Sequence, residues 1–244
     1  MTGAGSSIIF IHGLGIDSRI FKDQVDFFQD QYRAICYDLR GHGRSSAPKT
    51  GYSYKAFADE LKGLVDNLKL RDFHLVGLSM GGAIAARYFL ENPGPAKSIS
   101  FVGAHIVGYQ VFEKWPNFYK IAQMEGPDKA RETWNKFRLF ETVREDHVKY
   151  AQLTEMIDEH SCAPWLDPNP RYEEINDLER ISKIDVPVLI TIGRHDQDFA
   201  PVAHILRNSI PKNRFREFDA GHLVSFESSQ KFNNLLLDFL KSIE

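Results

Sequence analysis

The chain reads FHLVGLSMGGAIAA at residues 73–86. Its first five residues form an apolar run that predicts a buried strand, and the small residues at the end predict a helix packed closely against a sheet. Between the two, residues 77–81 follow the G-x-S-x-G pattern of a nucleophile elbow. This context indicates that Ser79 carries a reactive hydroxyl above the end of a strand, at the positive end of a helix dipole.

Outward from this elbow, apolar runs alternate with amphipathic runs along most of the chain. The runs that predict strands are 7–11, 33–38, 73–77, 98–103, 186–193 and 214–218. Apolar stripes at helical spacing begin at Phe57 and at Phe232. Such alternation of strands and helices predicts an α/β fold with a mostly parallel, doubly wound sheet.

Residues 105–180 interrupt the alternation, because they contain no run typical of a strand. We predict that they form a helical lid inserted into a core made of residues 1–104 and 181–244. A second packed layer without a ligand role is the alternative. The aromatic residues of the insertion that are available for an apolar pocket are Trp115, Phe118, Tyr119, Trp134, Phe137 and Trp165. Its arginines Arg131, Arg138 and Arg144 are interpreted as solvated surface charge rather than as ligands of a substrate carboxylate.

The composition excludes several classes of function. With 244 residues, 43% hydrophobic and 26% charged, the chain has the size and composition of one globular domain. A net charge of −3 argues against a nucleic-acid partner, and no apolar run reaches the roughly 18 residues of a membrane helix. The first residues lack the pattern of a signal peptide, and Cys36 and Cys162 do not form a disulfide framework. We therefore expect a cytoplasmic protein with reduced thiols.

A nucleophilic serine needs a base and an acid that orients the base. Among the nine histidines, His222 follows the last predicted strand and comes after Ser79 in the chain, whereas His12 and His42 are expected to brace glycine-flanked loops. Asp196 is the predicted acid because it follows the strand 186–193, and Asp198 is its competitor. A helix cap for the segment near Pro201 is the structural alternative for Asp196.

The developing oxyanion of an acyl transfer needs two hydrogen-bond donors. The N–H of Met80 follows the nucleophile, and the N–H of Leu14 lies in the glycine-rich loop 12–15 after the first strand. These two groups are the predicted oxyanion hole. The histidines lack the spacing of a metal site, so we expect neither a metal nor an organic cofactor.

In the order Ser79, Asp196, His222, the chain resembles the α/β-hydrolase fold superfamily over nearly its whole length. The loops at 12–15, 38–45, 193–196 and 221–222 carry the same resemblance. Serine at the nucleophile position is unlike the epoxide hydrolases and haloalkane dehalogenases, which have Asp there. Within the serine branch, the segments 38–45 and 221–227 resemble carboxylesterases and 3-oxoadipate enol-lactonases.

The resemblance implies a serine hydrolase that cleaves a small-molecule ester or lactone. Two alternatives stay open: a carbon–carbon bond hydrolase of dioxo acids, although Leu14 interrupts the glycines of the His-Gly-Gly-Gly loop common there, and a ligand-binding receptor on a hydrolase scaffold. The resemblance also implies two further strands before the first loop, which this sequence lacks. The strand 33–38 should then form an open sheet edge, which predicts a homodimer through that edge or a start that has lost native residues.

Overall fold

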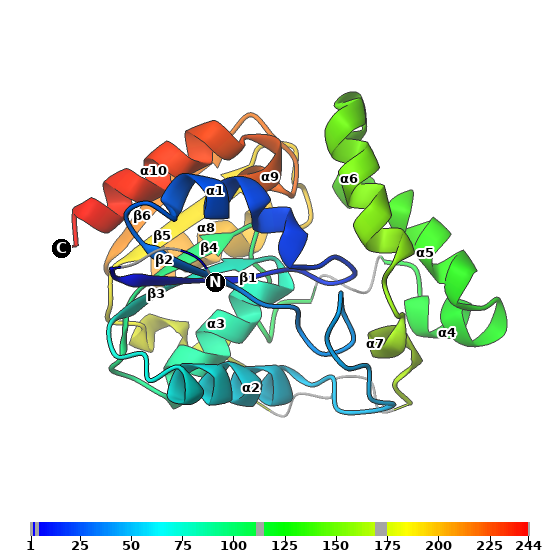
Figure 1. The fold of residues 1–244 in the computed structure, drawn as a ribbon, viewed down its shortest axis with the longest axis horizontal. Coiled ribbons are helices and arrows are strands. Elements are labelled where there is room, and N and C mark those ends of the chain that lie inside the picture. The colour runs from blue at the N-terminus through cyan, green and yellow to red at the C-terminus, as the bar shows by residue number, and fades with distance from the viewer. Residues whose placement is uncertain (1, 3–4, 111–114, 169–174, 244) are drawn as a thin grey trace.

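The computed structural model describes residues 2, 5–110, 115–168 and 175–243. In these residues six parallel strands form one sheet in the order β2-β1-β3-β4-β5-β6 (Figure 1). The strands are β1 (Ser7–Ile11), β2 (Arg33–Cys36), β3 (Phe73–Leu78), β4 (Ala96–Val102), β5 (Val188–Gly193) and β6 (Asn213–Phe218). The predicted α/β fold with a parallel sheet is confirmed.

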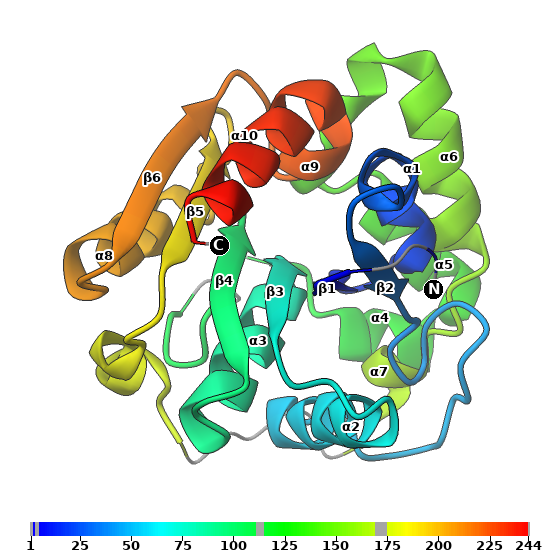
Figure 2. The same cartoon turned by 60° about the vertical axis from the view of Figure 1, so that its left-hand side comes forward.

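Helices cover both faces of the sheet. The core helices are α1 (Lys22–Phe28), α2 (Tyr54–Asn67), α3 (Met80–Glu91), α8 (Ala200–Ser209), α9 (Val224–Glu227) and α10 (Ser229–Lys241). Figures 1 and 2 show α1 and α10 on one face and α2 and α3 on the other. The sheet is covered on both sides as a result, which explains why β1, β3 and β5 are buried throughout and are mostly apolar rather than alternating.

A helical insertion lies between β4 and β5, and none of its described residues belongs to a strand. Its helices are α4 (Phe118–Met124), α5 (Pro127–Asn135), α6 (His147–Asp158) and α7 (Ala163–Leu166). The short 3₁₀ helices η3 (Arg138–Phe140), η4 (Val143–Glu145) and η5 (Leu178–Lys183) also lie between β4 and β5, whereas the 3₁₀ helix η1 (Ser18–Phe21) precedes α1 in the core. The insertion stands beside one end of the core (Figure 1). The domain boundaries given above, and the action of this segment as a lid, stay predictions.

Two strands are shorter than the sequence predicts. The predicted strand 33–38 ends at Cys36, because the carboxylate of Asp38 accepts the N–H groups of Ser18 and Arg44, both at 3.0 Å, and turns the chain into a loop. The predicted strand 186–193 begins at Val188, since Pro187 has no N–H to donate to a ladder.

Strand β2 is the edge of the sheet, as predicted, but fewer of its main-chain N–H and C=O groups are unpaired than a fully open edge would leave. Thr2 forms an antiparallel bridge with Ala34, in which each N–H donates to the other residue's carbonyl at 3.1 and 2.9 Å. The side chains of Ala34 and Ile35 are buried. Dimerisation through this edge stays a prediction.

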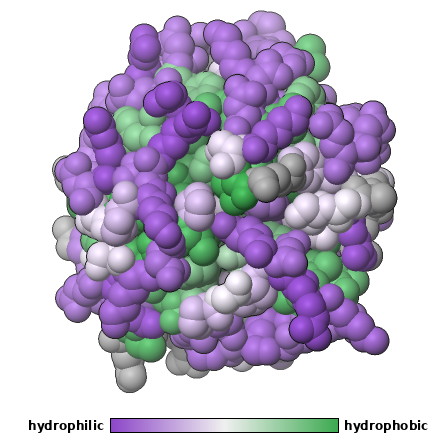
Figure 3. All heavy atoms as spheres, turned by 90° about the vertical axis from the view of Figure 1, so that its left-hand side faces the viewer, coloured by the Kyte–Doolittle hydropathy of each residue, from purple (hydrophilic) through white to green (hydrophobic). Residues whose placement is uncertain are grey.

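The face drawn in Figure 3 is largely polar, and the two cysteines are not joined to each other. Figure 3 shows a mostly hydrophilic face with apolar areas separated by polar side chains. No described helix combines the length and the apolar character that crossing a bilayer requires. Cys36 and Cys162 are both free, and burial raises the pKa of Cys162 to about 11.

A buried ion pair joins α3 to the chain that returns from the insertion. The guanidinium Nε of Arg87 lies 2.7 Å from Oδ2 of Asp177, and the two side chains are 1% and 0% exposed. We expect Asp177→Ala to lower the free energy of unfolding by about 3–5 kcal/mol, because it removes the nearer counter-charge of a buried guanidinium and leaves Glu91 at 3.8 Å as the more distant one. Urea denaturation measures this loss. The control is Asp66→Ala, which breaks the exposed Lys62–Asp66 pair; an equal effect of both changes would contradict the prediction.

Candidate active site

Ser79 lies at the turn between β3 and α3 and has a positive φ of 54°. A residue with a side chain rarely adopts this backbone conformation, and such strain persists only where the surroundings enforce it. Here the Ser79 N–H donates to the Val102 carbonyl at 2.9 Å, and the Ser79 carbonyl accepts from Gly82 and His105 at 2.9 and 3.1 Å. The turn is therefore tied to β4 and to the loop after it.

Glycines permit this turn. A Cβ on Gly77 would lie 2.4 Å from the Gly81 carbonyl oxygen, and a Cβ on Gly81 would lie 2.1 Å from the Ile11 carbonyl oxygen. Both contacts are with main chain, which cannot move aside cheaply. The G-x-S-x-G spacing thus reflects how closely α3 passes the ends of β1 and β3, as the sequence predicts for an elbow.

His222 and Asp196 are joined by a hydrogen bond. His222 Nδ1 lies 2.7 Å from Asp196 Oδ2, and both residues are buried at 3% exposure. Because the carboxylate can only accept, Nδ1 carries the proton, and Nε2 of the neutral ring is left to accept another. The Phe199 ring stacks on the imidazole at a centroid distance of 4.6 Å. This arrangement suits a general base held in one tautomer.

The structure distinguishes the two candidate acids. Asp196 Oδ1 also accepts the Phe199 N–H at 3.2 Å, so the carboxylate holds the start of the next helix as well as His222. Asp198 instead contacts the insertion, with its carboxylate 2.8 Å from Arg138 Nη2 and 3.2 Å from Trp115 Nε1. Asp196 thus binds both His222 and the Phe199 N–H just before α8, whereas Asp198 contacts the insertion.

The loop after β1 approaches Ser79 closely. A Cβ on Gly13 would lie 3.2 Å from Ser79 Cβ, which places the neighbouring Leu14 beside the nucleophile. His12 holds this loop, since its Nδ1 donates to the Gly13 carbonyl at 2.8 Å and its Nε2 accepts the Leu39 N–H at 3.0 Å. Burial lowers the pKa of His12, which keeps this doubly engaged ring neutral. The bracing role predicted for His12 is confirmed, while the N–H groups of Leu14 and Met80 stay predicted oxyanion donors.

Two further histidines also have structural contacts. His42 Nδ1 donates to the Arg40 carbonyl at 3.0 Å, as expected of a loop brace. His74 Nδ1 lies 2.8 Å from Ser98 Oγ inside the sheet. Within the described part of the chain, no group of three histidine, cysteine or acidic side chains could hold a metal ion.

A small cavity of about 10 Å³ adjoins Ser79. Its lining residues are Leu14, Tyr54, Ser79, Met80, His105, Trp115, Trp134 and Phe199. Trp115 and Trp134 therefore contact this space as the sequence suggested, whereas Phe118, Phe137 and Trp165 pack around Trp134 within the insertion. Tyr119 is exposed.

Sequence reasoning missed three lining residues. Tyr54 is the first residue of α2, and His105 follows β4, so neither belongs to a motif. Phe199 lies in the same loop as Asp196, three residues after it. The position of Phe199 beside a predicted acid was the one signal that could have indicated a role in the site.

The arginines of the insertion bind its own main chain. Arg131 donates to the His160 carbonyl at 2.8 Å, and Arg144 donates to the carbonyls of Asn135 and Phe137 at 3.1 and 2.9 Å. Arg131 and Arg144 are therefore half-buried and bound to main-chain carbonyls rather than freely solvated, whereas Arg138 is an exposed charge as interpreted from the sequence. Arg138 instead pairs with Asp198 of the core.

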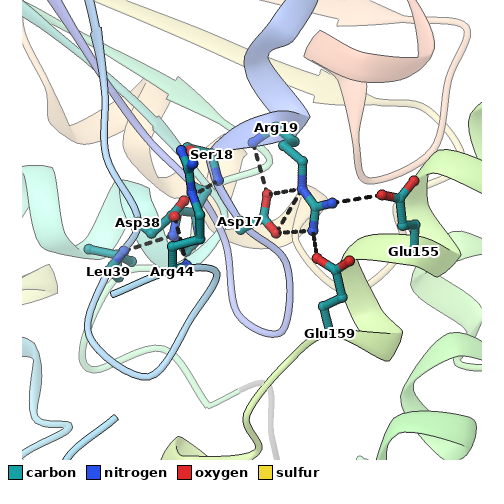
Figure 4. Close-up of polar contacts among 9 residues, drawn as sticks. Asp17, Ser18, Arg19, Asp38, Leu39, Arg44, Glu155 and Glu159 are labelled. Carbon is teal, nitrogen blue, oxygen red and sulfur yellow. Dashed lines mark hydrogen bonds and ion pairs between the residues drawn. The ribbon is translucent and has the colours of Figure 1, made fainter. Parts of the chain in front are cut away.

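A second group of charges joins the insertion to the loop after β1 (Figure 4). Arg19 is held by Asp17 and reaches Glu155 of α6 and Glu159 just after it, with N···O distances of 3.0 and 2.6 Å to the two glutamates. On the other side, Asp167 accepts the N–H groups of Gly51 and Tyr52 at 3.1 and 3.3 Å. The insertion is thus attached to the core at two separate places.

Comparison of the sequence with known proteins identifies the family of this chain. The sequence profile of the alpha/beta hydrolase fold matches residues 7–229. The chain belongs to the α/β-hydrolase fold family. The prediction of an α/β-hydrolase enzyme is confirmed.

Relatives in this family have several activities. A protein named non-heme chloroperoxidase CPO-A1, from Kitasatospora aureofaciens, is 44% identical over 98% of this chain and 93% of its own length. A 2-hydroxy-6-oxononadienedioate/2-hydroxy-6-oxononatrienedioate hydrolase from Paraburkholderia phymatum is 29% identical over 98% of this chain and 88% of its own. The solved structure of Est816, described as an N-acyl homoserine lactone degrading enzyme, is 28% identical with a TM-score of 0.81, covering 98% and 94% of the two chains. Proteins named 3-oxoadipate enol-lactonase, from Acinetobacter baylyi, also match, as the sequence resemblance predicts.

Proposed function

We propose that this protein is a serine hydrolase that cleaves a carboxylic ester or lactone through an acyl-enzyme. The observation that carries the proposal is the 2.7 Å bond from His222 to Asp196, formed in a chain that also holds Ser79 on a strained elbow. The two free cysteines favour a reducing compartment, so we place the enzyme in the cytoplasm.

The mechanism follows from the protonation of His222. Its Nε2 takes the proton of Ser79 while the Ser79 oxygen attacks the carbonyl carbon, and the N–H groups of Leu14 and Met80 stabilise the oxyanion. His222 then returns the proton to the leaving alcohol oxygen as the ester bond breaks. Water, deprotonated by His222, attacks the acyl-enzyme and releases the acid and Ser79. Asp196 keeps the proton on Nδ1 throughout, which leaves Nε2 available.

The cavity beside Ser79 favours short acyl groups. Its volume of about 10 Å³ admits roughly one water-sized group, and aromatic rings surround it. We expect kcat/KM for p-nitrophenyl octanoate to be at least about tenfold below that for p-nitrophenyl acetate, because the longer chain must displace packed side chains.

Two substitutions of aromatic residues in the insertion test whether the cavity sets this preference. Trp134→Ala should enlarge the cavity and raise the octanoate to acetate ratio. Tyr119→Ala also removes an aromatic ring from the insertion, but from an exposed residue that does not line the cavity, so it should leave that ratio unchanged. A wild-type preference for octanoate would contradict the small-acyl expectation.

A substrate panel tests the proposed function as a whole. It contains p-nitrophenyl esters, a homoserine lactone, an enol-lactone and a dioxo acid, all assayed with the same protein. Hydrolysis of esters or lactones supports the proposal. Cleavage of the dioxo acid alone would favour a carbon–carbon bond hydrolase, and binding without turnover of any compound would favour a receptor.

A second candidate is peroxide-dependent halide oxidation, which the 44% identity with a chloroperoxidase favours. The same acyl-enzyme can be attacked by hydrogen peroxide in place of water, which gives a peracid and frees Ser79. The peracid then oxidises a halide to hypohalous acid and returns to the carboxylic acid. Adding peroxide, acetate and bromide to the panel detects this activity, which should disappear in Ser79→Ala.

A further inference from the structure

Glu227 is the last residue of α9, and its side chain turns back towards the loop that carries His222. Its Oε2 accepts the Gly221 N–H at 2.8 Å, and its Oε1 accepts the Leu223 N–H at 2.9 Å. One carboxylate therefore binds the main chain immediately before and immediately after His222. Hydrogen bonds to an ionised acceptor are about twice as strong as neutral ones, so this is a firm attachment.

The main chain of this loop is confined by close contacts on both sides. A Cβ on Gly103 would lie 2.8 Å from the His222 carbonyl oxygen, and a Cβ on Gly221 would lie 2.0 Å from Thr142 Oγ1 of the insertion. The His222 ring is fixed separately, by Asp196 at Nδ1 and by the stacked Phe199. Glu227 instead holds the main chain around the ring, through the N–H groups of Gly221 and Leu223.

The insertion reaches the same turn. Lys149 of α6 places Nζ 2.8 Å from the Phe226 carbonyl oxygen and 2.9 Å from that of Glu227. The main chain of Glu227 is therefore held from the insertion, while its side chain holds the His222 loop.

We propose that Glu227 is a positioning residue, whose carboxylate holds the N–H groups of the residues before and after His222 and so maintains the ring orientation that Asp196 requires. This inference rests on the proposed function, since it assigns a task to a base. A displacement of a catalytic group by about 1 Å can cost roughly a hundredfold in rate, which sets the expected size of the effect.

Two substitutions test separately the negative charge and the side-chain length of Glu227. Glu227→Gln keeps the length but offers one carbonyl oxygen to two N–H groups and removes the negative charge. We expect kcat for ester hydrolysis to fall about 10- to 100-fold with KM within about twofold of wild type. The rising limb of the profile of kcat/KM against pH should also move to lower pH, because a negative charge that favours the His222 imidazolium is lost. Glu227→Asp keeps the charge but is too short for both N–H groups, so kcat should fall while the profile stays in place.

The control is Asp219→Asn. Asp219 lies three residues before His222, is exposed and pairs with Arg194 and His195 at the surface. Its neutralisation removes the same charge from the same segment without touching the peptides that flank His222, so kcat and the pH profile should stay close to wild type.

The outcomes are distinguishable. Wild-type kcat in both Glu227 variants would overturn the inference, and so would failure of both variants to fold, because Glu227 would then serve stability alone. A loss of kcat in Glu227→Gln with an unmoved pH profile would also overturn it. Ser79→Ala is measured in parallel: if that variant is inactive while both Glu227 variants behave as wild type, the inference fails and the proposed function stands. If Ser79→Ala remains active, the proposed function itself fails.

Discussion

Ser79→Ala should abolish ester hydrolysis, with a loss in kcat on the order of 10⁴ to 10⁶. The alanine removes only Oγ, and the hydrogen bonds that form the elbow come from the main chain of residue 79, so the fold should be retained. A fluorophosphonate probe, which reacts with an activated serine, should label the wild type and leave the variant unlabelled. Circular dichroism checks that the variant is folded.

Ser209→Ala is the matched control for this experiment. Ser209 ends α8, away from the elbow, and its replacement should change neither turnover nor labelling. Undiminished labelling of Ser79→Ala would show that the probe reacts elsewhere and would remove Ser79 from the mechanism.

Asp196→Asn should lower kcat by about 10⁴, because an amide donates as well as accepts and favours the wrong tautomer of His222. It also weakens the acceptor for the Phe199 N–H, whose ring stacks on the imidazole. Steady-state kinetics with p-nitrophenyl acetate measure the loss, and binding of the substrate should change much less than kcat.

Asp198→Asn is the comparison that makes this result specific. The amide oxygen of this variant would still accept from Trp115, and only the ion pair with Arg138, whose side chain is 45% exposed, would be lost. We expect kcat to stay within about fivefold of wild type. A severe loss in Asp198→Asn together with a mild one in Asp196→Asn would mean that the acid in the mechanism is two residues further along the chain.

Local patterns predicted most of the fold and part of the site. The elbow around Ser79 could be predicted because its requirements are all local: an apolar strand, two glycines and a row of small residues. His222 could be chosen by chain order alone. The strand ends were less predictable, since β2 ends where the Asp38 carboxylate accepts hydrogen bonds from the N–H groups of Ser18 and Arg44.

The remainder depended on contacts between segments far apart in the chain. Asp196 and Asp198 have the same chemistry, and only the positions of His222 and Arg138 assign them different partners. Tyr54 and His105 line the cavity because α2 begins and β4 ends near Ser79, which no periodicity reveals. The two hydrogen bonds of Glu227 are local in sequence, but a carboxylate five residues after a histidine has no distinctive pattern.

The insertion between β4 and β5 has a consequence for how such an enzyme can diversify. Its described residues pair with no strand, yet Trp115 and Trp134 supply part of the wall around the nucleophile. Substitutions there can change which acyl groups fit while the register of the sheet and the glycines of the elbow stay as they are. Laboratory evolution of substrate range should therefore accumulate its productive changes in this segment, and changes at Gly77 or Gly81 should be eliminated early.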